Sequence, residues 1–196
     1  MGLVDGIEVS IPGYFTAEMP VPSLDLFAIS TLTRRDVGFV IGADILNNIA
    51  FMIGGSPTFA IVLAPPGSIR VGWEAPIEIA IGSNGISASI GNEEAVLGID
   101  LGSSYDLTIA ERRWDHFITD EQAVSSTTSI GAMGMPTRTL TAQLPLTIGT
   151  IERTARAVQV RNLGFGYDAN LGFGFFAGET VLFDLSEGRI LIRRPQ

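Results

Sequence analysis

The residues best suited to chemistry stand in the segment Asp100-Leu101-Gly102-Ser103-Ser104. The apolar run before it, residues 95–99, predicts a buried strand that leads into Asp100. A carboxylate at the end of a strand, followed by a glycine that lets the backbone turn tightly, can serve as a general acid or base. The same spacing is typical of an ordinary turn, in which the aspartate accepts hydrogen bonds from backbone N–H groups. Both interpretations stay open at this point.

The counts of cysteine, histidine and lysine exclude several classes of functional site. The chain has no cysteine and a single histidine, His116, which excludes thiolate metal sites and zinc sites built from several histidines. All twelve basic residues are arginine, so a phosphate-binding loop with its lysine is excluded. The acidic residues lack the spacing of a calcium loop. The sequence therefore predicts neither a metal nor a cofactor.

Composition points to a folded, largely β protein. Hydrophobic residues make up 46% of the 196 residues and charged residues 17%, which excludes a disordered chain, and 23 glycines favour many tight turns. The net charge of −9 argues against nucleic acid as a partner. No segment has the roughly 20 uninterrupted apolar residues of a membrane span. The first residues do not have the pattern of a signal peptide.

Short apolar and alternating runs separated by turn residues predict the individual elements. A short helix is expected over 112–117, and a mobile polar loop over 125–134. The expected strands are 77–81, 86–90, 95–99, 180–184 and 189–192, the last two joined by a turn at 186–188.

An internal repeat governs the expected organisation. When the chain is shifted by 130 residues, apolar and glycine positions superpose without a gap. The matched pairs are Ile41 with Leu171, Gly42 with Gly172, Leu46 with Phe176, Phe51 with Val181, Ile53 with Phe183 and Val62 with Ile192. Each copy is expected to place a short helix after its glycine and to end in a hairpin. Upstream, Ile7–Ile11 is similar to Leu144–Ile148.

The repeat divides the chain into residues 1–66 and 67–196, with the linker Ala64-Pro65-Pro66-Gly67-Ser68 between them. The second part carries a front half, including the segment at Asp100, for which the first part has no counterpart. We therefore expect the back of one lobe followed by a complete second lobe.

The strand ending in Asp100-Leu101-Gly102-Ser103, the later segment Ala169-Asn170-Leu171-Gly172 and the closing hairpin resemble one lobe of the pepsin/retropepsin-like aspartic proteases. The resemblance covers residues 75–196, and residues 5–64 resemble the back half of a preceding lobe. It implies a mainly β fold of acid-protease barrel lobes with one or two short helices. Two-lobed bacterial proteins of this family look similar along their length, which favours the periplasm or secretion, although the localisation itself stays unknown.

The resemblance also implies a reaction. Two carboxylates would share a proton and activate a water for attack on a peptide bond, with Asp100 as one of them. The second would come from another chain in a homodimer or from a missing N-terminal lobe segment. Gly102 would bring its N–H near the carboxylate, Ser103 would hydrogen-bond the aspartate, and Ser104 completes the loop. Leu101 departs from the family, which has a Thr or Ser hydroxyl there to tie the two active-site loops together.

Two further hypotheses belong to other classes. The chain could be a non-catalytic protein that binds peptides or other ligands on the same scaffold, with Leu101 recording the lost chemistry. It could also be an unrelated β-barrel whose resemblance is accidental. Scaffolds are reused for different functions, so the fold alone does not choose between the first two hypotheses, whereas a structure separates the third from both.

Overall fold

The computed structural model confirms a mainly β protein, with 55% of residues in strands, 14% in helices and a closed six-stranded barrel. It describes the whole chain except residues 1, 14, 24–25, 28–29, 32–33, 35, 37–39, 55–59, 70, 120–123, 131–135, 162, 164–165 and 194–196.

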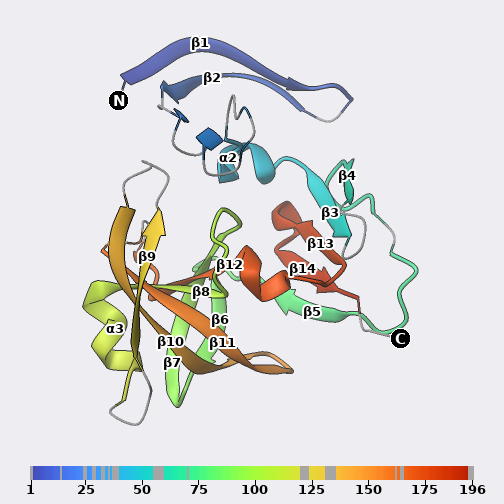
Figure 1. Cartoon of the computed structure of the whole chain (residues 1–196). Helices are drawn as coiled ribbons and strands as arrows, with labels where there is room; N and C mark the ends of the chain where they lie inside the picture. The colour runs from blue at the N-terminus through green and yellow to red at the C-terminus, as the bar shows by residue number, and fades with distance from the viewer. Residues whose placement is uncertain are drawn as a thin grey trace.

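The barrel is formed by the second part of the chain. Its strands run in the order β6, β7, β12, β8, β11 and β10, and the β10–β11 pairing closes the ring. Strand β9 extends β10 beyond the ring, and helix α3 lies against the barrel (Figure 1). The bounds are β6 Ile86–Ile90, β7 Glu93–Asp100, β8 Leu107–Ala110, α3 Glu111–Phe117, β9 Ser125–Ile130, β10 Pro136–Ile148, β11 Ile151–Val160 and β12 Ala169–Gly172.

Both parts of the chain contribute to a second, five-stranded sheet with the order β4-β3-β13-β14-β5. Its strands are β3 Ala50–Gly54, β4 Ala60–Ala64, β5 Ile77–Ala80, β13 Val181–Asp184 and β14 Arg189–Ile192. The 3-10 turn η3 (Leu185–Glu187) joins β13 to β14, where Gly188 takes a positive φ of 66° that a larger side chain rarely adopts. The first part adds a separate hairpin of β1 (Gly2–Ile11) and β2 (Phe15–Ser23), which lies across the top of Figure 1.

The repeat positions carry equivalent elements. Gly42 precedes α2 (Ala43–Leu46) and Gly172 precedes η2 (Phe173–Phe176), as the shift of 130 residues predicts. Met52 pairs with its counterpart Leu182 in the antiparallel β3–β13 ladder. The flanking pairs, Phe51 with Phe183 and Ile53 with Val181, then follow the symmetry of a local two-fold axis through that central pair.

The prediction that the two repeat copies match without a gap is wrong beyond the turn of the closing hairpin. Met52 pairs with Val62, whereas Leu182 pairs with Leu191, so Val62 corresponds to Leu191 and not to Ile192. The reason is the turn length, since one more residue separates β3 from β4 than separates β13 from β14. The division at residue 66 stays a prediction, because strands from both sides share one sheet.

The segment Ser125–Gly134 was expected to be a loop, and this is wrong for its first half. Ser125–Ile130 forms β9, whose ladder with β10 runs from Ser125 opposite Thr141 to Ile130 opposite Pro136. Threonine suits a pleated strand even without apolar neighbours, and the pairing partner supplies the remaining stability. Residues 131–135 lie outside the described residues.

The core joins the barrel to the shared sheet. Phe183 on β13 stacks on Phe51 of β3 with ring centroids 4.9 Å apart, and Phe176 meets Phe183 edge-on at 5.1 Å. Trp114 and Phe117 of α3 are also buried in this cluster. The element that carries Asp100 is therefore built on a continuous apolar interior.

Candidate functional site

Asp100 lies at the end of a buried parallel strand pair. Strand β7 runs parallel to β12, and the last residue of each faces the other, Asp100 opposite Gly172. Leu97 and Leu171, on these two strands, are fully buried. The two segments that the resemblance linked, 70 residues apart in sequence, are thus neighbours in space, and Asp100 is half-buried where they end.

The turn after Asp100 is held by the aspartate itself. The backbone N–H of Gly102 donates to Asp100 Oδ1 at 3.0 Å, and the N–H of Ser103 donates to the Asp100 carbonyl oxygen at 3.1 Å. Gly102 is exposed, and its N–H lies near the carboxylate as expected. An ordinary Asx turn has the same bond, so this contact is common to the catalytic and the structural interpretation.

Two glycines let the loop pack directly on β12 and η2. A Cβ on Gly172 would overlap the carbonyl oxygen of Tyr105, and one on Gly174 would lie 2.5 Å from the carbonyl oxygen of Ser104. The backbones are joined by hydrogen bonds from Gly172 N–H to Asp106 O and from Phe173 N–H to Ser103 O, both 2.9 Å. Only glycine permits so close an approach between two backbones.

The hydroxyl of Ser103 has a partner other than the one expected. Its Oγ lies 3.1 Å from Thr108 Oγ1 on β8 and accepts a bond from the Tyr105 N–H at 3.3 Å. Thr108 is 6% exposed, so this hydroxyl pair is largely shielded from solvent where it ties the loop to β8. Sequence reasoning missed Thr108, although a polar residue within the apolar strand Leu107-Thr108-Ile109-Ala110 was a usable signal.

The other two loop residues differ from each other in environment. Leu101 is half-buried and packs against the main core, so a side chain without a hydroxyl stabilises the loop by apolar contact. Ser104 is exposed, and its carbonyl oxygen accepts a hydrogen bond from Arg156 Nη2 of β11 at 3.0 Å. Arg156 was also missed, because nothing in the sequence relates it to residues 50 positions earlier.

The residues described give no sign of a metal centre. Among them, no group of three or more His, Cys, Asp or Glu side chains is close enough to hold an ion. Asp106, the next carboxylate after Asp100, already accepts the Arg156 N–H at 2.7 Å. Asp100 thus offers a half-buried carboxylate at a strand end.

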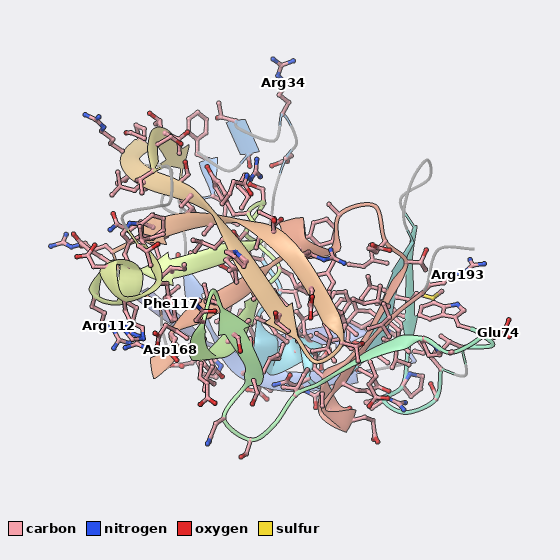
Figure 2. All side chains as sticks on the ribbon, turned by 90° about the horizontal axis from the view of Figure 1, so that it is seen from below. Arg34, Glu74, Arg112, Phe117, Asp168 and Arg193 are labelled. Carbon is pink, nitrogen blue, oxygen red and sulfur yellow. The ribbon has the colours of Figure 1, made fainter. Side chains whose placement is uncertain are left out.

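A cavity of about 590 Å³ lies elsewhere, over β6 and β7. Hydroxyls of Ser87, Ser89 and Thr147 line it with the carboxylates of Glu94 and Asp168. Asp168 also pairs with Arg113 at 2.9 Å, and Figure 2 shows it beside Arg112 and Phe117 near α3. None of residues 100–104 lines this cavity, so a molecule acted on by Asp100 would not bind in it.

Within the described part of the chain, no helix has the length and apolar character needed to cross a membrane. No protein-family model matches the sequence, and no curated protein is significantly similar to it.

Proposed function

We propose that the chain is an aspartic endopeptidase, or part of one, on a pepsin/retropepsin-like scaffold. Asp100 supplies one carboxylate, and a second chain or a further polypeptide segment supplies the other. The substrate is a peptide or protein bound in extended form. The observation that carries the proposal is the position of Asp100, at the end of the parallel pair β7–β12, beside a glycine turn packed on Gly172.

The mechanism needs two carboxylates about 3 Å apart, because their mutual repulsion keeps one protonated and one ionised. The ionised member removes a proton from a water that attacks the peptide carbonyl carbon, and the protonated member donates to the carbonyl oxygen. Among the described residues, the Gly102 N–H is the hydrogen-bond partner of Asp100 Oδ1, and Oδ2 would face the substrate water in this proposal.

Exposed apolar side chains in the first part of the chain support a partner. Ile41 is 38% exposed, whereas its repeat counterpart Leu171 is 0% exposed between β7 and β8. Val40 and Phe27 are 61% and 76% exposed. The greater exposure of Ile41 than of its buried counterpart is the contrast that supports a homodimer or another strand-supplying partner in this proposal.

The test compares the chain with Asp100→Asn on an unstructured protein substrate, from about pH 3 to about pH 7, at several chain concentrations. Asp115→Asn on the exposed side of α3 is the matched control, since it removes the same charge away from the loop. We expect cleavage that Asp100→Asn abolishes and Asp115→Asn preserves. A rate that rises more steeply than the concentration would indicate a dyad assembled between chains.

A non-catalytic peptide- or ligand-binding protein is the second candidate. The packing of Leu101 into the core favours it, because the loop is stabilised there without the hydroxyl that a catalytic pair would use. In that case, folded chain at every concentration should leave the substrate intact, and peptide binding measured by calorimetry should not change on Asp100→Asn. Cleavage that depends on Asp100 would exclude this candidate and also an unrelated barrel.

A further inference from the structure

The side chain of Arg156 contacts the loop that follows Asp100. Arg156 of β11 donates from Nη2 to the Ser104 carbonyl oxygen at 3.0 Å, and its guanidinium carbon lies 4.6 Å from the centre of the Tyr105 ring. The two backbones are also joined reciprocally: Arg156 N–H donates to Asp106 Oδ2 at 2.7 Å, and Asp106 N–H donates to Arg156 O at 3.1 Å.

We propose that Arg156 is a positioning residue for Asp100, in that it fixes residues 104–106 and thereby the carboxylate at the start of the loop. This inference deepens the proposed function. It rests on that function only where Arg156 is said to position a catalytic carboxylate. The structural part, that an exposed side chain of β11 helps to hold residues 104–106 of the Asp100 loop, stands without any enzymatic activity.

The arrangement explains how the loop is held although residue 101 is a leucine. Ser103 is bonded to Thr108 of β8, and Gly172 and Phe173 are bonded to the loop from β12 and η2. Arg156 adds a contact from β11 to the Ser104 carbonyl oxygen and to the Tyr105 ring. A planar guanidinium can cover an aromatic ring and donate to a carbonyl at once, which a lysine cannot do.

Arg153 provides a matched comparison on the same strand. It too donates to a backbone carbonyl, Phe175 O at 2.8 Å, and lies over an aromatic ring, that of Phe175 at 4.3 Å. Its targets belong to η2 instead of the Asp100 loop. Removing either guanidinium therefore deletes one hydrogen bond and one cation–π contact, and removing that of Arg153 also deletes an ion pair with Glu179 at 3.9 Å. Only Arg156→Ala deletes contacts with residues 104–105.

The first experiment is hydrogen exchange and ¹⁵N–¹H spectroscopy of the full chain, the two alanine variants and Arg156→Lys. In Arg156→Ala we expect the Gly102 and Ser103 amide signals to move. The exchange of the Gly172 and Phe173 amides should become about ten times faster, the effect of one hydrogen bond and one exposed cation–π contact. Arg153→Ala should leave the Gly102 and Ser103 amides as they are, because its contacts are with Phe175 of η2. Arg156→Lys should recover part of the difference.

The second experiment measures peptide cleavage by the same variants. Because a misplaced reacting group slows the chemical step more than it weakens binding, Arg156→Ala should lower kcat by at least about tenfold with little change in KM. Equal behaviour of the Arg156 and Arg153 variants in both experiments would overturn the proposal, and so would full recovery by lysine. If the amide signals respond to Arg156→Ala but neither the parent nor any variant cleaves peptides, the proposed function fails while the loop-holding role survives.

Discussion

The two repeat-related glycines, Gly172 and Gly42, should differ in how much stability the same substitution costs. In Gly172→Ala the new Cβ would overlap the carbonyl oxygen of Tyr105, which is backbone and cannot rotate away. In Gly42→Ala the Cβ would meet, among the described residues, only the Asp44 side chain, with Oδ1 at 2.6 Å; this side chain is flexible and exposed. The pair therefore isolates the close packing of the Asp100 loop from the general effect of replacing glycine.

The expected magnitudes follow from the contacts. Gly172 has φ −93° and ψ 170°, which alanine adopts without strain, so the cost arises from overpacking alone. Overpacking costs about 1–3 kcal/mol, and a rigid backbone neighbour places it near the upper end. The loss of glycine freedom in the unfolded chain returns about 0.4–1 kcal/mol. We expect Gly172→Ala to destabilise by about 2 kcal/mol and Gly42→Ala to change stability by less than about 0.5 kcal/mol in either direction.

Urea unfolding followed by tryptophan fluorescence provides the assay, because Trp114 is buried against the barrel. The slope with denaturant must stay the same for the free energies to be compared. Equal losses for the two variants would mean that Gly172 is not seated on the loop as described, and the proximity of Asp100 to β12 would lose its main support.

Two further predictions concern contacts of the strand β13 in the shared sheet. Asp184 is fully buried and accepts hydrogen bonds from Gly67 N–H through both oxygens at 3.2 Å and from Arg189 at 3.1 Å. Asp184→Asn should therefore lower the free energy of unfolding in urea by about 2–3 kcal/mol. A loss below about 0.5 kcal/mol would contradict this account. Phe51 and Phe183 stack with an interplanar angle of 13°. A double-mutant cycle with leucine at both positions should give a coupling energy of about 0.5–1.5 kcal/mol. Additive effects of the two substitutions would show that the rings contribute to stability independently.

Local patterns in the sequence were sufficient for many elements. The alternating runs predicted β6 and β14 to the residue, and β5, β13 and α3 within one residue. In these segments apolar residues recur with the period of the element, and glycine marks the turns. The pattern failed for β9, whose hydroxyl side chains carry no apolar signal and whose stability comes from its ladder with β10.

The candidate site was less accessible to sequence reasoning, because its contacts are long-range. Asp100 and the Gly172 segment were identified, but the partner of Ser103 depends on which side of β8 faces the loop, and Thr108 was missed. Arg156 lies in a different hairpin, and its relation to Ser104 exists only once β8 and β11 pair in parallel. A single sequence contains no signal for such pairing between distant strands.

The local two-fold axis through Met52 and Leu182 gives Gly42 a further meaning. The backbone of Tyr105 occupies the space beside the Cα of its counterpart Gly172, whereas within the described residues a Cβ on Gly42 would meet only the Asp44 side chain. If a second aspartate-bearing loop docks in the first part of the chain as Asp100's loop does in the second, symmetry places it on Gly42. Gly42→Ala should then leave the stability of the separate chain unchanged but lower the activity or association that depends on the second carboxylate. A variant with full activity would mean that the second carboxylate, if there is one, is held in a different way from the first.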